Sequence, residues 1–285
     1  PPPPPPPLFS SIRRHTRYIG DWSSDVCSSD LNIFFAGALV TGSWADPKFL
    51  GTRFDAGVDF FGLAVRGSDT LYRQDEEVPE EEIDQRALNI LFNLGHPIGK
   101  FAKGTMTYRL EHTDYARSDT TAEDFRMPVD HFTHTLRLGL AYSRFGYRVR
   151  LNGSYNKRSD WQPWGLPGSG DYDPDHEDFL RYRASLQKTF YFEKFRRAGV
   201  EIQYVDGQDL DRFSKYELGY FSEVRVRGYE SNRIRADSAL SSTISYGVAI
   251  GELFRLQGLA DVAWITDDEN ELNQEFASGV GVAGT

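Results

Sequence analysis

Apolar and polar residues alternate along this chain at every second position, which is the period of a β-strand and not that of a helix. In residues 146–157, one face carries Tyr147, Val149, Leu151, Gly153 and Tyr155, and the other carries Arg148, Arg150, Asn152, Ser154 and Asn156. Segments of this kind recur from near Phe35 onward, with no long helical period between them. The pattern predicts an all-β protein whose strands have one apolar and one polar face.

Eleven segments follow this pattern. We expect strands at residues 33–42, 53–66, 86–94, 101–116, 132–143, 146–157, 179–191, 196–206, 238–250, 253–266 and 274–284. Short turns alternate with long polar loops, and the long loops are 67–85, 117–131, 158–178, 207–237 and 267–273. This alternation is typical of a transmembrane antiparallel β-barrel, with short periplasmic turns and longer extracellular loops. A soluble β-sandwich, the alternative fold, gives no reason for every long loop to lie at one end.

The assignment of the longest connection, 207–237, decides on which side of the membrane that connection lies. Residues 212–220 within it have some strand propensity, and counting them as a barrel strand would move the rest of the connection to the periplasmic side. We treat 207–237 as one loop, because the long loops then all share one side.

Composition and charge exclude some classes of protein. The chain of 285 residues has a net charge of −10, which argues against a nucleic-acid partner, since such proteins usually carry a basic surface. No stretch approaches the roughly 18 consecutive apolar residues of a membrane helix. The mean hydropathy of −0.51 remains compatible with a barrel, whose strands are half polar.

The polar strand faces are basic, whereas the acidic runs lie in the long loops. The arginines on these faces, which would line the lumen of a barrel, are Arg137, Arg148, Arg150, Arg181, Arg183 and Arg197. The sequence therefore predicts a basic lumen beneath acidic loops.

The first 31 residues differ from the rest. They contain seven prolines, then RRHTR and DWSSDVCSSDL, which resemble the conceptual translation of a sequencing adapter. We exclude residues 1–31 from the fold and expect residues 32–285 to form the barrel domain. The only cysteine, Cys27, lies in the excluded segment, so we expect no disulfide or thiol chemistry in the remainder.

One motif points to a family. The loop 207–237 contains Val226, Arg227, Gly228 and Tyr229, followed by an R-x-R-x-D run that ends at Asp237. The later segment 259–264 reads LADVAW and contains Asp261. Here the sequence resembles the BamA/TamA family of outer-membrane assembly barrels, within the bacterial surface antigen superfamily.

The resemblance implies a role for these residues. In that family a V-R-G-F/Y loop folds back into the lumen and places its arginine against an acid on the inner wall. The matching pair here is Arg227 and Asp261, which we expect to bind in a bidentate manner. The family often has a second acid on the strand after the loop, and Ser245 stands at that position.

The resemblance also implies an architecture and a function. Family barrels have sixteen strands preceded by periplasmic POTRA domains, so we expect about eleven of the sixteen strands here, in an incomplete barrel without those domains. The implied function is assembly, insertion or translocation of proteins in a Gram-negative-type outer membrane, and whether the branch is assembly, two-partner secretion or lipid export stays open. The alternative is a porin-like channel whose basic lumen attracts anions.

The same resemblance implies a set of partners. The expected partners are outer-membrane lipid, unfolded client outer-membrane proteins and, through POTRA domains, periplasmic chaperones or accessory subunits. We expect no enzymatic activity, cofactor or metal, because residues 32–285 contain none of the common catalytic or nucleotide-binding motifs.

Overall fold

The computed structural model describes residues 28–34, 39–63, 67–73, 76–168, 176–193, 196–220, 222–229, 234–250, 254–267 and 276–284. Most of these residues lie in strands, and the helices are two 3-10 turns, Phe49–Gly51 and Pro79–Glu81. None of the described segments is a helix with the length and hydropathy of a membrane span. The all-β prediction is confirmed.

One large antiparallel sheet dominates the molecule. Its strands, in spatial order, are β1 (Ser28–Phe34), β2 (Leu39–Asp46), β3 (Asp55–Leu63), β7 (Ile83–Ile98), β8 (Ala102–Arg117), β9 (His131–Arg144), β10 (Tyr147–Arg158), β11 (Asp178–Tyr191), β12 (Arg197–Gln208), β16 (Ser238–Ile250), β17 (Phe254–Thr266) and β18 (Phe276–Gly284). The short strand β4 (Gly67–Asp69) pairs with β7 beside this path. β5 (Tyr72–Arg73) and β6 (Glu76–Glu77) form a separate hairpin.

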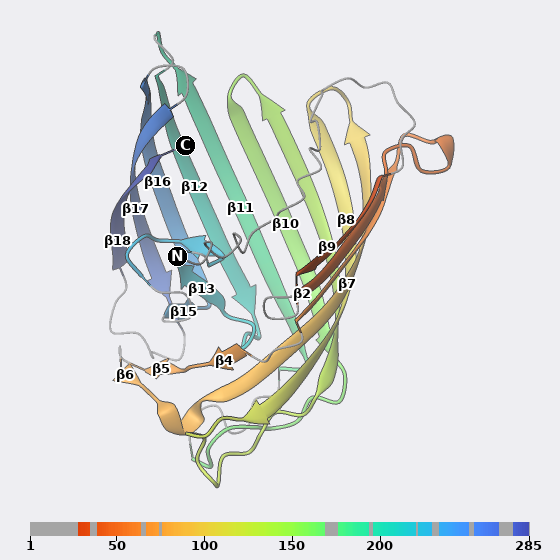
Figure 1. Cartoon of the computed structure of the whole chain (residues 1–285), viewed down its shortest axis with the longest axis vertical. Helices are drawn as coiled ribbons and strands as arrows, with labels where there is room; N and C mark the ends of the chain where they lie inside the picture. Colours follow the sequence, from red (N-terminus) through yellow and green to blue (C-terminus); the bar gives the residue numbers. More distant parts are fainter. Residues whose placement is uncertain are drawn as a thin grey trace, which may run out of the picture.

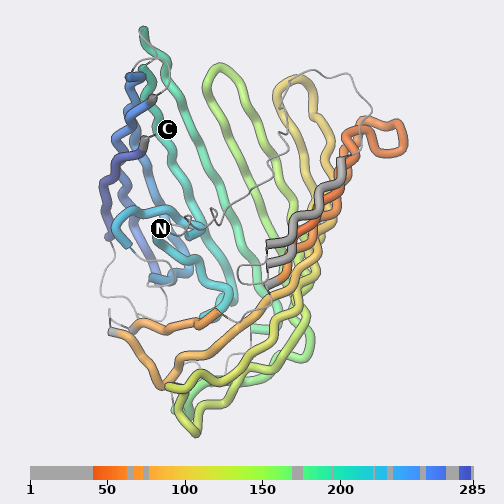
Figure 2. Tube along the Cα trace, viewed as in Figure 1, coloured from red at the N-terminus to blue at the C-terminus, as the bar shows by residue number. Residues whose placement is uncertain are grey.

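The sheet bends into a trough (Figures 1 and 2), with β16–β18 in one wall and β2 and β7 in the other. Its two outermost strands, β1 and β18, are not paired with each other in the described part of the chain. The fold is therefore that of an incomplete antiparallel barrel, as the strand pattern predicts.

The two faces of the strands differ as expected. On β9, Leu136 and Leu138 point outward from the trough and are 44% and 58% exposed, whereas Thr133 and Thr135 are buried on the concave side. Outward aromatic residues such as Tyr155 and Trp264 continue this apolar outer surface on other strands. Because the side-chain period of a strand is two, the sequence alternation fixes which face is apolar.

The connections also follow the predicted alternation. β9 and β10 are joined by two residues, Phe145 and Gly146, which both have positive φ (50° and 75°), as a tight type I′ hairpin requires. Long connections at the opposite end join β8 to β9, β10 to β11 and β12 to β16. β12 and β16 are hydrogen-bonded neighbours, so the chain between them leaves the sheet and returns to it.

One strand prediction is wrong. The single strand expected at 33–42 is replaced by β1 and β2, so the main path has twelve strands and not eleven. β1 includes residues 28–31 of the segment that we exclude from the fold. The adapter origin of that segment stays a prediction, and residues 1–27 lie outside the described part.

The strand propensity at 212–220 is real, but these residues do not add a strand to the barrel sheet. β13 (Tyr216–Gly219) pairs with β14 (Val224–Arg225) and β15 (Ile234–Ala236), outside that sheet.

Candidate functional site

The connection between β12 and β16, residues 209–237, lies against the concave face of the sheet (Figure 1). We call it the lumenal loop. Its apolar side chains Leu218, Val224 and Val226 have no exposed surface. They form one core with concave-face residues of β11, β12 and β16–β18, which are Phe179, Val205, Ala239, Ala263, Ile265 and Ala277. The loop is thus held by apolar packing as well as by polar contacts.

Arg227 binds Asp261 of β17. Its Nη1 lies 2.6 and 2.5 Å from the two carboxylate oxygens, and its backbone N–H donates to Oδ2 at 3.1 Å. Thr243 of β16 donates to Oδ1 at 2.7 Å, and the Asp261 side chain is only 1% exposed. The structure therefore brings the two expected residues together, but through one guanidinium nitrogen and the main chain, not through a two-nitrogen fork.

The tip of the lumenal loop surrounds this pair. Val226 is buried and donates its N–H to the Gly219 carbonyl at 3.1 Å, while Tyr229 packs against the loop core. Gly228 has φ +90°, a conformation that other residues rarely adopt. The V-R-G-Y motif therefore combines an apolar contact, an ionic contact and a turn.

Two glycines of β18 receive this tip, and the sequence analysis did not single them out. A Cβ atom on Gly279 would lie 1.8 Å from the Arg227 carbonyl oxygen, and one on Gly281 would lie 2.6 Å from Cδ of Arg227. Gly279 is the register partner of Asp261. The repeat of glycine at every second position of one strand face was the available signal.

The remaining motif residues lie nearby without joining the pair. The Ser245 hydroxyl donates to the Gly199 carbonyl at 3.5 Å, and Thr243, two residues earlier, is the β16 side chain that contacts Asp261. The backbone N–H of Asp237 donates to the Thr266 carbonyl at 3.1 Å, where the loop rejoins the sheet.

A second buried ion pair fixes the start of the lumenal loop. Arg158, at the end of β10, binds Asp211 with two nitrogens at 2.8 and 2.9 Å, and both side chains are under 5% exposed. Ser214 donates its backbone N–H and hydroxyl to Asp211 at 3.1 and 2.7 Å. Burial alone would raise the pKa of Asp211, but the Arg158 charge and these hydrogen bonds hold it below its usual value.

A third cluster ties the loop to the opposite wall of the trough. Asp69 of β4, which is 1% exposed, accepts hydrogen bonds from Arg212 Nε at 2.9 Å and from Arg235 of β15. Arg212 also donates to the carbonyls of Asp69 and Glu81 at 2.7 and 2.8 Å. Burial opposes ionisation of Asp69, yet the charges of Arg235 and Arg212 outweigh it and lower its pKa.

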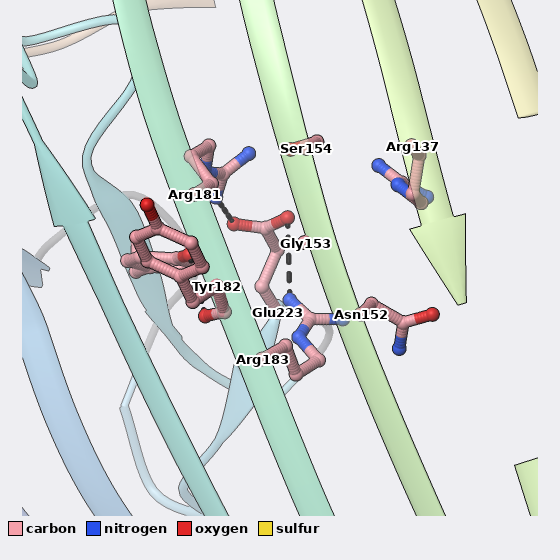
Figure 3. Close-up of a pocket in the computed structure, with 9 residues that line it drawn as sticks. Arg137, Asn152, Gly153, Ser154, Arg181, Tyr182, Arg183 and Glu223 are labelled. Carbon is pink, nitrogen blue, oxygen red and sulfur yellow. Dashed lines mark hydrogen bonds and ion pairs between the residues drawn. The ribbon is translucent and has the colours of Figure 1, made fainter. Parts of the chain in front are cut away.

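The basic lining of the concave face is only partly neutralised. Arg181 and Arg183 of β11 both bind Glu223 of the lumenal loop, and Arg137 lies across β10 from them (Figure 3). Toward the short turns, the predicted residues Arg148 and Arg197 contact the side-chain oxygens of Gln187 and Gln257 at 3.3 and 3.5 Å, and Arg150 is exposed. The arginines share the predicted face, but the loop supplies a carboxylate that the sequence analysis did not anticipate.

Among the described residues, no group of three or more His, Cys, Asp or Glu side chains is arranged to hold a metal ion. The carboxylates named above are instead bound by arginines and hydroxyl groups. The contacts of the site fit a structural attachment of the loop.

Comparison with known proteins supports the fold. No family model matches the chain. No curated protein matches it either. Among solved structures, the chain is similar to BamA from Haemophilus ducreyi lacking POTRA domains 1–3, with a TM-score of 0.60, 10% identity, and coverage of 87% of this chain and 55% of that one.

Two further structures superpose less well. CdiB from Acinetobacter baumannii has a TM-score of 0.47, 10% identity, and coverage of 89% and 52% of the two chains. The anion-selective porin from Comamonas acidovorans has a TM-score of 0.33, 10% identity, and coverage of 87% and 84%. The chain spans about half the length of the BamA chain, and the likeness shows that it has the fold of a BamA-like β-barrel.

Proposed function

We propose that the chain is the barrel part of a protein that assembles, inserts or translocates other proteins at a Gram-negative-type outer membrane, in the manner of the BamA/TamA family. The observation that carries the proposal is the Arg227–Asp261 pair, because it fastens a V-R-G-Y loop tip to the inner wall of a BamA-like sheet. The apolar outer face supports a lipid environment.

The mechanism needs no covalent chemistry. Open strand edges present unpaired N–H and C=O groups, which can template an incoming client strand by edge pairing. In this role the lumenal loop stabilises the curved sheet from inside, and Gly228 provides its turn. The partners in this proposal are outer-membrane lipid, unfolded client proteins and the periplasmic factors that POTRA domains would recruit.

The test is to replace Arg227 or Asp261 with alanine in the full-length parent that the sequence predicts. Each variant leaves a buried charge without its partner, which costs about 3–5 kcal/mol of stability. We expect loss of heat-modifiable migration on a gel and lower levels of client outer-membrane proteins in cells. The matched control is Arg225→Ala, since Arg225 is exposed in the same loop. Normal migration and normal client levels in both variants would refute the proposal.

A porin-like channel is the second candidate, favoured by the exposed Arg150 on the concave face. An open basic lumen attracts anions. The lumenal loop and Glu223 argue against free passage, because they occupy this side of the sheet. Steady anion-selective conductance of single molecules in a bilayer favours the channel, whereas small and erratic conductance favours the assembly barrel.

A further inference from the structure

Three arginines face one cavity on the concave side of the sheet. Arg137 comes from β9, and Arg181 and Arg183 come from β11, with β10 between them (Figure 3). The cavity has a volume of about 140 Å³, and Asn152 and Ser154 of β10 add polar groups to its wall. Glu223 is the one acid among the residues that line it.

The Glu223 carboxylate does not pair with all three guanidinium groups. Arg181 Nη2 binds Glu223 Oε2, and Arg183 Nη2 lies 3.4 Å from Oε1. The Nε–H of Arg181 is buried and has no acceptor in the described part of the chain. Arg137 likewise has no ion-pair partner among the described residues. The cavity therefore has more hydrogen-bond donors and more positive charge than Glu223 can satisfy.

The Glu223 contact also differs from the other ionic attachments of the loop. The Glu223 side chain is 38% exposed, whereas those of Asp211 and Asp261 are 3% and 1% exposed. An exposed ion pair contributes little to stability, while a buried one is costly to break. Glu223 can therefore leave its arginines while the buried pairs keep the loop in place.

We propose that Arg137, Arg181 and Arg183 form a binding site for an oxyanion, meaning a carboxylate or phosphate group, which takes the place of Glu223. Guanidinium groups match both kinds of anion through paired, charge-assisted hydrogen bonds. Glu223 is the internal occupant of this site, so it competes with the incoming anion. The inference rests on the cavity and does not depend on the proposed assembly function.

The test is calorimetric titration of the 285-residue chain, folded in detergent micelles, with sodium phosphate or sodium acetate at constant ionic strength. Glu223→Gln removes the competing charge, so we expect phosphate to bind it about tenfold more tightly than the unmodified chain. Arg137→Gln removes one charged donor and should weaken binding about tenfold. The matched control is Arg148→Gln, because Arg148 lies on the same face but outside the cavity; binding should not change.

The site is disproved if neither the unmodified chain nor Glu223→Gln binds phosphate or acetate saturably, or if Arg148→Gln weakens binding as much as Arg137→Gln. Circular dichroism and heat-modifiable migration verify folding of each variant. Arg137 forms no ion pair or hydrogen bond with the described residues of the loop, so Arg137→Gln decides the question if Glu223→Gln does not fold. Binding of phosphate without acetate identifies the ligand group as phosphate, and binding of acetate without phosphate identifies it as carboxylate.

Discussion

At the residue scale, the tip of the lumenal loop comes close to the sheet at two glycines of β18, Gly279 and Gly281. The Arg227 backbone occupies the space that a side chain on Gly279 would need. A strand interior normally disfavours glycine, so its presence there indicates close approach of another backbone. Gly279 therefore matters for the Arg227–Asp261 contact although it makes no polar contact through a side chain.

We expect Gly279→Ala to destabilise the protein by about 1–3 kcal/mol, the usual cost of forcing extra atoms into a packed site. The Arg227 tip would have to move away from β18 to admit the new methyl group. The measurement is the midpoint of urea unfolding, followed by tryptophan fluorescence. The control is Gly258→Ala in β17, because a Cβ there has no neighbour within 4 Å. Equal midpoints for both variants would show that the tip is not packed this tightly.

The ionic partners at this scale were only partly predictable. Asp261 follows Arg227 by 34 residues and lies in a recognisable strand motif, so the sequence indicated it. Asp69 was missed because its partners Arg212 and Arg235 are 143 and 166 residues away. It also lies in a polar connection, where an acid resembles any solvated side chain.

At the scale of elements, the lumenal loop behaves as a small folded unit. It has its own sheet of β13, β14 and β15, shares an apolar core with the barrel sheet, and has buried ion pairs near both ends. The sequence predicted one excursion between two barrel strands, but not this internal sheet. Strands of two to four residues contain too few positions for an alternating pattern to be recognised.

The attachment of the loop should be sensitive to acid. Asp69 and Asp211 have pKa values below the ordinary carboxyl value of 3.8, because arginines stabilise their ionised forms in the folded state. The unfolded state therefore binds protons first as the pH falls, and the stability from these pairs, complete above about pH 4, is lost as the pH falls toward their folded-state pKa values.

Limited proteolysis of the loop measures this loss, using pepsin from pH 4 down to pH 2. We expect cleavage within residues 209–237 to accelerate over this range relative to a denatured control. Asp211→Asn should remove part of the pH dependence, whereas Asp119→Asn should leave it unchanged because Asp119 is an exposed residue of another loop. A pH profile that Asp211→Asn does not alter would contradict the role of this ion pair.

At the scale of the whole molecule, alternation alone was enough to define the two faces of the trough. The apolar exterior and polar interior follow from the strand period, since each residue must point opposite to its neighbours. The first predicted strand failed because alternation continues through residues 39–46, where the chain has already reversed into β2. Alternation marks the face of a residue but not the place where one strand ends and the next begins.

The outer face can be tested by charge substitution. We expect Leu138→Lys to destabilise the barrel in phospholipid vesicles by about 2–4 kcal/mol, the cost of a lysine on a lipid-facing site near the midplane. Thr105→Lys should cost much less, because Thr105 of β8 points into the trough beside Gly139. Urea unfolding in vesicles measures both. Similar losses would mean that the outer face is not in contact with lipid.

The ion pairs of the lumenal loop also have a consequence for the order of folding. Asp69 precedes its loop partner Arg212 by 143 residues, and Asp261 follows the loop on a later strand. The loop can therefore be fixed only after both walls of the trough have formed, and contacts of such long sequence separation form slowly. Until that moment Leu218, Val224 and Val226 lack their buried surroundings. A nascent chain would pass through a late stage in which the sheet is complete while its concave side still exposes apolar surface.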